Sequence, residues 1–381
     1  MDADRPRLAI FTREIPAADP TPTDPEATGT RLGGGDFTPL ASSAPAIASD
    51  GSRYLLTDGR ADVEGTLLRS AGPGQPFTLQ QTRTAGSALA AAREISVVGT
   101  DVVFARSTPT TLEVRRSSDL GQTFAVTTSI ATTVPLHAST ATATGAVFAM
   151  LLDPMRSLAF TMAFAASPTA PITLTSGFTG GDVNAFNITS GVLLPASTGA
   201  VLVLDVSLWD GSGSQRLLVR RYDSTGAITS QVVVDPLLGT GYYQPARGCG
   251  LVTDAVLCVN RTSARRIDLA TGVVTVAALP AKNEQEVPTA PIELADGRVL
   301  LPGVLAERPH TFHAGYRLST DGVSWGPFQA LRPTGGDGQE VYGVAAEAGG
   351  RALFLLGDSG LMMAGDGQTT AQGVVQAATI P

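Results

Sequence analysis

The chain has 381 residues and a net charge of −8, with 16% charged and 43% hydrophobic residues. We expect no nucleic-acid partner, because such binding depends on Lys and Arg neutralising phosphates. No run of about 18 uninterrupted apolar residues occurs, so we also expect no membrane span. The 42 Gly and 25 Pro, with abundant Val, Thr and Ser, favour many short strands joined by turns.

Residues 1–40 differ in composition from the rest of the chain. Residues 7–14, RLAIFTRE, are predicted to form one strand, and the Pro, Thr, Asp and Gly that follow predict a linker or a long surface loop. Such a strand is suggestive of a β-propeller, in which one terminus often closes the ring. The first residues, MDADRPR, lack the basic and apolar regions of a signal peptide, so the chain is either cytoplasmic or the product of signal removal.

A repeated unit begins at Ser43 and recurs about every 45 to 55 residues, which is the spacing of propeller blades. Each unit contains two apolar runs separated by a turn, and then a strand that enters a polar loop containing Gly. Neighbouring units bury the sheet faces of one another, and closure into a ring removes the long edges. We therefore predict an all-β protein in which residues 41–381 form one β-propeller domain of seven four-stranded blades.

The polar loops share two residue types with a clear physical role. A glycine supplies the positive φ angle of a tight turn, and an aspartate shortly before it accepts hydrogen bonds from loop amides. Phe124 and Trp325 are expected to cover two of these loops from the apolar side. The pairs of aspartate and glycine are Asp119 and Gly121, Asp223 and Gly226, Asp268 and Gly272, Asp321 and Gly322, and Asp366 and Gly367.

Two of these loops carry a resemblance to a known family. SSDLGQTF at residues 117–124 resembles the Asp-box, and STDGVSW at residues 319–325 resembles a shorter form of it. On these motifs, residues 40–381 resemble the sialidase-like, or BNR-repeat, propellers. In that family the loop lies away from the ligand-binding channel, so the resemblance implies architecture and not activity. The implied structural Asp-box residues are Ser117, Asp119, Gly121, Phe124, Ser319, Asp321, Gly322 and Trp325.

The same resemblance implies candidate catalytic residues. They are Asp62 as acid/base and Tyr342 as a nucleophile activated by Glu286 (or Glu284), with Arg60 and Arg308 gripping a substrate carboxylate.

The sequence departs from the family at the start of the first blade. Sialidases carry an Arg-Ile-Pro motif there, whereas this chain has Ser43 and Ala44 at the place of the arginine. An incomplete arginine triad favours a protein without catalytic activity.

The two cysteines, Cys249 and Cys258, flank the sequence GLVTDAVL. A two-residue loop at Thr253 and Asp254 would place them in a close non-hydrogen-bonded pair, which suits a disulfide. The alternative is two buried free thiols, because Thr-Asp is not a preferred turn sequence. A disulfide predicts a secreted, periplasmic or cell-surface location.

Taken together, these observations predict an exported, non-catalytic propeller that binds a glycan or protein partner through loops at the channel mouth. One alternative is a glycoside hydrolase of the sialidase-like class. Another is a structural subunit of an extracellular assembly, in which residues 7–14 engage a neighbour. We expect no cofactor, because the sequence contains no phosphate loop or dinucleotide fingerprint. We also expect no metal, because His310 and His313 would lie on opposite faces of a strand.

Overall fold

The structure is a computed structural model of the whole chain. It describes residues 30–31, 38–39, 44–58, 65–83, 87–89, 92, 94–152, 160–177, 185–208, 215–234, 248–253, 255–260, 263–279, 286–308, 311–331, 339–359 and 371–380. These residues contain strands and turns and no α-helix. Accordingly, the described part of the chain has no helix that is long and apolar enough to cross a membrane.

The described strands form seven antiparallel sheets, which we number in chain order. The first three are sheet 1, with β2 (Thr38–Pro39), β3 (Ala46–Ile47), β4 (Arg53–Asp58), β5 (Gly65–Ser70) and β6 (Thr78–Arg83); sheet 2, with β7 (Ser96–Val98), β8 (Asp101–Ser107), β9 (Thr111–Ser117) and β10 (Ala125–Ala131); and sheet 3, with β11 (Leu136–Ala141), β12 (Val147–Leu152), β13 (Phe160–Ala165) and β14 (Thr173–Ser176).

The remaining sheets follow the same order. They are sheet 4, with β15 (Ala185–Ala196), β16 (Gly199–Leu208), β17 (Gln215–Asp223) and β18 (Ile228–Val234); sheet 5, with β19 (Cys249–Val252), β20 (Ala255–Val259), β21 (Ser263–Asp268) and β22 (Val274–Ala278); sheet 6, with β23 (Glu286–Pro288), β24 (Ile292–Glu293), β25 (Val299–Arg308), β26 (Thr311–Ser319) and β27 (Gln329–Ala330); and sheet 7, with β28 (Gln339–Glu347), β29 (Arg351–Ser359), β30 (Ala371–Thr379) and β1 (Thr30–Arg31).

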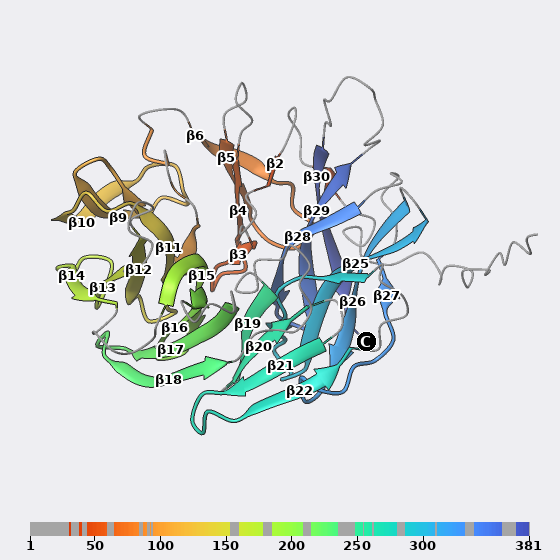
Figure 1. Cartoon of the computed structure of the whole chain (residues 1–381). Coiled ribbons are helices and arrows are strands. Elements are labelled where there is room, and N and C mark those ends of the chain that lie inside the picture. The colour runs from red at the N-terminus through yellow and green to blue at the C-terminus, as the bar shows by residue number, and fades with distance from the viewer. Residues whose placement is uncertain are drawn as a thin grey trace, which may run out of the picture.

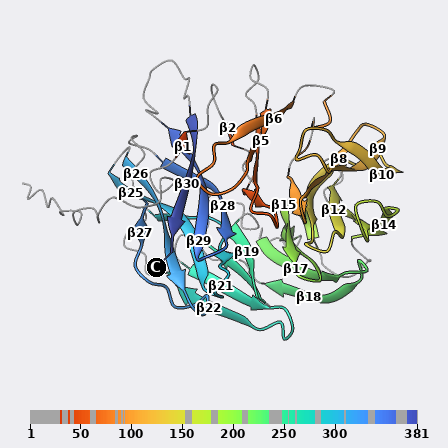
Figure 2. The same cartoon turned by 180° about the vertical axis from the view of Figure 1, so that it is seen from behind.

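The sheets are arranged around a ring (Figures 1 and 2). In each sheet the first strand lies toward the centre and the last lies at the rim, where β10, β14, β18 and β22 are drawn. Burial follows this order, because β12 in the middle of sheet 3 is almost entirely buried whereas all four residues of β14 are exposed. The prediction of an all-β propeller is therefore confirmed.

Apolar clusters fill the spaces between neighbouring sheets. On β16, Leu202 and Leu204 belong to the cluster shared with sheet 3, whereas Val201 and Val203 belong to the cluster shared with sheet 5. A strand buried on both faces reads as a continuous apolar run, and AVLVLDV in β16 has this pattern.

The central strand is interrupted in sheets 1 and 6. In sheet 6, β23 pairs with residues 303–305 of β25 and β24 pairs with residues 299–300 of the same strand. Pro288 and Pro291 fall at this interruption, and proline has no N–H to donate to a strand partner. The five strands of sheet 6 therefore correspond to four strand positions, one of which is split.

The N-terminal part of the chain closes the ring. Thr30 pairs with Val375 and Arg31 with Val374, so that β1 forms the outer strand of sheet 7. The sequence also predicts an N-terminal strand, but it places this strand at residues 7–14, which lie outside the described residues. The closing strand in the described part of the chain is β1, within the range 1–40 that the sequence assigns to a strand and linker.

A buried ion pair joins the first and last sheets. On β4, the fully buried Arg53 donates from Nε to Glu347 Oε1 at 2.5 Å and from Nη2 to Glu347 Oε2 at 2.8 Å. Glu347 ends β28, 294 positions later in the chain. The two parallel hydrogen bonds match the fork of the guanidinium to the carboxylate, and they fix β4 of sheet 1 to β28 of sheet 7.

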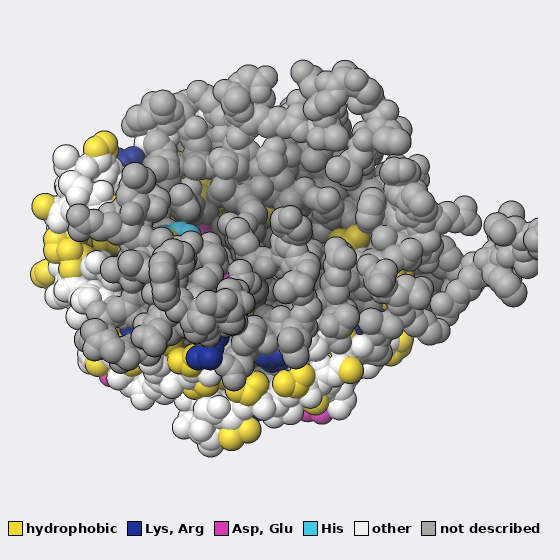
Figure 3. All heavy atoms as spheres, in the orientation of Figure 1, with side chains coloured by type: hydrophobic (Ala, Val, Ile, Leu, Met, Phe, Trp, Pro, Cys, Tyr) yellow, Lys and Arg dark blue, Asp and Glu magenta, His cyan; other side chains and the backbone are white. Residues whose placement is uncertain are grey.

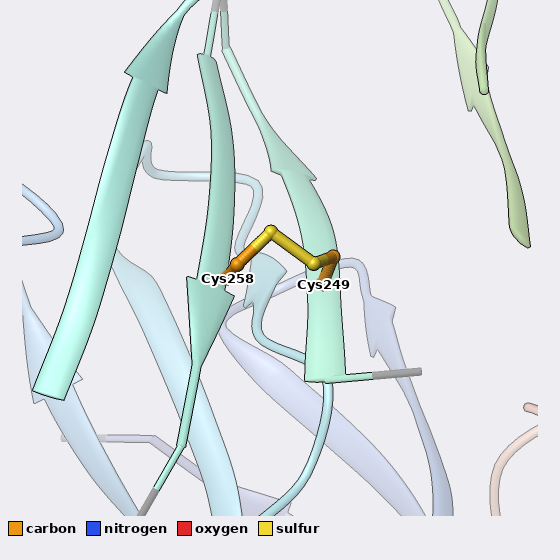
Figure 4. The surroundings of a disulfide bond; sticks show 2 residues. All are labelled: Cys249 and Cys258. Carbon is orange, nitrogen blue, oxygen red and sulfur yellow. A yellow bond between two sulfur atoms is a disulfide. The ribbon is translucent and has the colours of Figure 1, made fainter. Parts of the chain in front are cut away.

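The disulfide between Cys249 and Cys258 is confirmed. Cys249 pairs directly with Cys258 across β19 and β20, and their Cα atoms lie 4.0 Å apart (Figure 4). Both residues are buried in the cluster between sheets 4 and 5. The turn at Thr253 has a positive φ of 42°, which is uncommon for a residue other than glycine.

Candidate functional site

The antiparallel order of the strands gives the ring two distinct ends. At one end of the ring, the first strand of a sheet begins and its second strand ends. Thr38 at the start of β2 pairs with Asp58 at the end of β4, and Glu286 at the start of β23 pairs with Leu305 near the end of β25. We call this the mouth end. The hairpins between first and second strands and between third and fourth strands lie at the other end, which we call the turn end.

The loop after β9 lies at the turn end and is held by its aspartate. Ser117 Oγ donates to Asp119 Oδ1 at 2.7 Å, and the amide of Thr123 donates to the same oxygen at 2.9 Å. The amide of Gly121 donates to Ser117 Oγ at 2.9 Å. The hydrogen bonds from Ser117 and Thr123 lower the pKa of Asp119 from 3.8 to about 2. This carboxylate is therefore committed to the turn.

Three further loops use the same arrangement. Asp321 accepts from the amides of Val323 at 2.8 Å and Ser324 at 2.6 Å, and these bonds lower its pKa. Asp223 and Asp268 likewise accept amide and threonine hydroxyl hydrogen bonds within their own loops. All four aspartates lie at the end of the third strand of a sheet or in the loop that leads to its fourth strand.

The glycine of each loop packs against the preceding sheet. A Cβ added to Gly121 would lie 2.9 Å from Leu67 Cδ2 in sheet 1, and one added to Gly226 would lie 2.7 Å from Phe164 Cγ in sheet 3. Phe124 is buried and contacts Phe104 with ring centroids 5.0 Å apart. Trp325 packs on the cluster that joins sheets 5 and 6. The loops therefore couple neighbouring sheets and do not form a reactive site.

The residues expected to carry chemistry fall at the mouth end where they are described. Glu286 begins β23, Arg308 ends β25, and Tyr342 lies near the start of β28. Strands β25 and β28 of neighbouring sheets are in contact. The backbone thus brings these three positions to one end of two adjacent sheets. Arg60 and Asp62 lie outside the described residues, in the sequence between β4 and β5.

Several strands carry a β-bulge near the mouth end, which the sequence did not predict. Leu136 of β11 pairs with Leu151 of β12 and Ala138 pairs with Met150, so His137 is the extra residue of a bulge. In the same way, Thr189 is extra in β15, and Tyr342 is extra in β28. Strands β11, β15 and β28 are all first strands of their sheets. Bulges are frequent beside functional sites because they change the direction of a side chain.

The charged residues on the first strands of the sheets are all acidic in the described ranges. Within those ranges the first strands contain no Lys or Arg, but they contain Glu286, Glu293, Glu340 and Glu347. Glu347 is paired with Arg53, and Glu293 accepts from Thr253 at the turn end. A cationic grip on an anionic ligand would therefore have to come from residues outside these strands.

The described residues contain no group of three or more His, Cys, Asp or Glu side chains that could hold a metal ion. The face of the molecule shown in Figure 3 includes a histidine and an acidic side chain that are visible between neighbouring atoms near the centre. His137 is half-buried by its surroundings.

Neither a protein-family model nor a curated protein matches this sequence. Solved structures do match. One belongs to a study of two prolyl endopeptidases, with a TM-score of 0.54 and 11% identity over 84% of this chain and 45% of that chain. Prolyl oligopeptidase B from Galerina marginata matches with a TM-score of 0.50 and 13% identity over 83% of this chain and 46% of that chain. The Dos1 propeller matches with a TM-score of 0.46 and 9% identity, over 92% and 96% of the two chains.

The first two structures have sequence identities of 11% and 13%, so they show similarity of fold alone. This chain spans about half the length of these two peptidase chains. The comparisons therefore agree with the fold and assign no activity to the mouth end.

Proposed function

We propose that this protein is an exported, non-catalytic β-propeller that binds a glycan or a protein partner at its mouth end. The observation that carries the proposal is the placement of the bulge residues His137, Thr189 and Tyr342. These three positions lie on the first strands of sheets 3, 4 and 7, so a ligand over the mouth would meet residues from separate parts of the ring.

In this account each of the seven sheets is one blade of the ring. The sialidase-like, or BNR-repeat, family is the proposed relationship, and the loops at Asp119 and Asp321 support it. Both loops place a serine, an aspartate and a glycine in one hydrogen-bonded turn, at 117–121 and 319–322. The family assignment concerns architecture, because these loops lie at the turn end.

Export is proposed on the basis of the disulfide. Cys249 and Cys258 are bonded and buried, and structural disulfides of this kind persist in oxidising compartments. A secreted, periplasmic or cell-surface location follows. The net charge of −8 continues to disfavour a nucleic-acid partner.

A sialidase-like glycoside hydrolase is the second candidate. Glu286, Arg308 and Tyr342 lie at the same end of two neighbouring sheets, which favours the hydrolase. The lack of an arginine at Ser43 and Ala44 disfavours it, because the arginine triad that would grip a substrate carboxylate is then incomplete. Binding without turnover therefore remains the leading function.

The test applies the full chain to a glycan array and, separately, to a fluorogenic sialoside. We expect retention of one or more glycans and no fluorescence above the rate of the buffer. Turnover that disappears in a Tyr342→Phe variant would establish the hydrolase instead. An array without any retained glycan would direct the search to a protein partner, through cross-linking in the native envelope.

A further inference from the structure

Two arginines and one glutamate form an ion cluster toward the mouth end of sheet 2. Arg106, one position before the end of β8, pairs across the strands with Glu113 of β9, and Arg115 lies two positions further along β9. Arg106 Nε donates to Glu113 Oε2 at 2.9 Å, and Arg115 Nε donates to the same oxygen at 3.0 Å. One carboxylate therefore holds two guanidinium groups beside each other, and the cluster has one positive charge in excess.

This cluster lies on the face of sheet 2 that is turned toward sheet 1. Phe104, two positions before Arg106, packs in the apolar cluster shared with sheet 1. Leu112 and Val114, on either side of Glu113, pack instead in the cluster shared with sheet 3. Alternate residues of a strand face opposite sides of the sheet, so all three charged side chains lie at the boundary of sheets 1 and 2. Their exposed fractions are 14 to 16%, so the cluster is partly shielded from solvent but accessible to it.

The backbone fixes both guanidinium groups. Arg106 Nη1 donates to the carbonyl oxygens of Ser87 at 2.9 Å and Ala88 at 3.2 Å. Arg115 Nη1 donates to the carbonyl oxygen of Phe124 at 3.4 Å. Each Nη2 atom, in contrast, donates to no residue that the structure describes, and neither atom is one of its buried unpaired groups. Both arginines therefore keep N–H groups for a ligand, in positions that need no further ordering.

The charge of the cluster limits the kind of anion that it suits. One excess positive charge matches a group with a single negative charge, such as a sulfate ester or a carboxylate. A phosphate monoester carries about −1.5 to −2 charges at pH 7 and would leave negative charge uncompensated. The net charge of −8 on the whole chain also disfavours a densely charged polyanion.

The geometry of the free donors favours the sulfate ester over the carboxylate. A planar carboxylate pairs best with two parallel N–H groups of one guanidinium fork. In this cluster Nε and Nη1 of both arginines are already engaged, so the free donors belong to two separate groups. A sulfate ester has three terminal oxygens that point in different directions, and it can accept from both groups at once.

From these observations we infer that Arg106 and Arg115 bind the sulfate ester of a sulfated sugar at the boundary of sheets 1 and 2. The two Nη2 atoms donate to the sulfate oxygens, and Glu113 keeps the two like charges together when the site is empty. The site is built from second and third strands of the ring. Binding here therefore goes beyond the proposed function and does not depend on the first-strand residues assigned to it.

The test titrates the full chain with three small probes at constant ionic strength, by ligand-observed NMR. The probes are N-acetylglucosamine 6-sulfate, glucuronate as a carboxylate of the same charge, and uncharged N-acetylglucosamine. We expect saturable binding of the sulfated sugar, weaker binding of glucuronate, and no binding of the uncharged sugar. Constant ionic strength keeps the screening of charge equal for all three.

Variants on β9 separate this site from a general attraction of charge. Arg115→Gln removes one donor group and should weaken binding of the sulfated sugar about 10- to 100-fold, the effect of one or two charge-assisted hydrogen bonds. Arg115→Lys keeps the charge without the guanidinium and should also weaken binding. Arg116→Gln is the matched control, because it removes the same charge from the next position, where Arg116 pairs with Asp101 and is 40% exposed. It should bind the sulfated sugar normally.

Melting temperatures establish that each variant is folded, and Arg115→Lys serves as the test if Arg115→Gln does not fold. Loss of binding in the Arg115 variants alone would support the inference. It would be overturned by a natural chain that shows no saturable binding of the sulfated sugar, or by tighter binding of glucuronate. Equal losses in the Arg115 and Arg116 variants would also overturn it, because they would show an attraction to net charge alone.

Discussion

Asp119 is a carboxylate that stabilises a turn and is not available for chemistry. Hydrogen bonds from Ser117 and Thr123 to its oxygens stabilise the charged form and hold the loop closed. The sequence predicts this role, because the spacing of serine, aspartate and glycine is local to the turn. The conformation of a turn can be predicted from its own residues, without knowledge of the strands that pair with it.

The depressed pKa of Asp119 predicts a dependence of stability on pH. Its pKa falls from 3.8 in the unfolded chain to about 2 in the folded protein, so its contribution is present above 3.8 and is lost as the pH falls through about 2. An Asp119→Asn variant lacks this titration. Its free energy of unfolding should therefore approach that of the natural chain between pH 4 and pH 2 in urea titrations. A difference that stays constant over this range would contradict the assignment.

Gly121 provides a second prediction. Its φ of 89° and the 2.9 Å approach to Leu67 both act against a side chain, so Gly121→Ala should lower the free energy of unfolding by about 2–4 kcal/mol. Gly297 has a φ of 83° and no atom within 4 Å of an added Cβ, so Gly297→Ala should lose only about 1–2 kcal/mol. Equal losses in chemical denaturation would show that the contact between sheets contributes nothing.

The ion pair of Arg53 and Glu347 could not be predicted in the same way. The two residues are 294 positions apart, and their contact depends on the order of sheets around the ring. The only local signal is a charged residue within the apolar strand RYLLTD. Sequence patterns show where a strand lies, but they do not show which charge it meets.

At the scale of elements, β4 and β28 are joined by this pair, and its loss should weaken closure of the ring. Glu347→Gln leaves a buried guanidinium without its counter-charge and should cost about 3–5 kcal/mol of stability. Arg116 and Asp101 form a pair with side chains 40% and 18% exposed, so Arg116→Met should cost less than about 1 kcal/mol. Urea unfolding of the two variants compares them directly. Similar midpoints for both would contradict the closing role.

The hairpin of β19 and β20 offers a further prediction. Replacement of Cys249 and Cys258 by serine should lower the free energy of unfolding by about 2–4 kcal/mol, because the cross-link restricts the unfolded chain. Both cysteines are buried, so thiol labelling after mild reductant should require unfolding. Rapid labelling of the folded protein would contradict the buried position.

The β-bulges at His137 and Tyr342 and the interrupted first strand of sheet 6 were not predicted. A bulge is a mismatch between two strands, so it has no signature within one of them. The apolar runs of β16 and β20, in contrast, are visible in the sequence, because burial on both faces leaves a continuous pattern.

At the scale of the whole molecule, the repeat of about 45 to 55 residues was sufficient to predict a ring, because each unit needs neighbours to cover its sheet. The sequence also suggested that an N-terminal strand closes the ring, with binding to a neighbour as the alternative. It did not identify β1 as that strand, because two residues within a linker of Pro, Thr and Gly show no periodicity.

The central claim is that the mouth end binds and the turn end holds the ring together. The most direct test measures the affinity of the best glycan from the array, or of the cross-linked protein partner, for three proteins. These are the natural chain, a His137→Ala and Tyr342→Ala double variant, and an Asp268→Asn variant at the turn end. The account predicts that the double variant loses binding while Asp268→Asn retains it, with both variants folded by circular dichroism. Retained binding in the double variant and lost binding in Asp268→Asn would contradict the account.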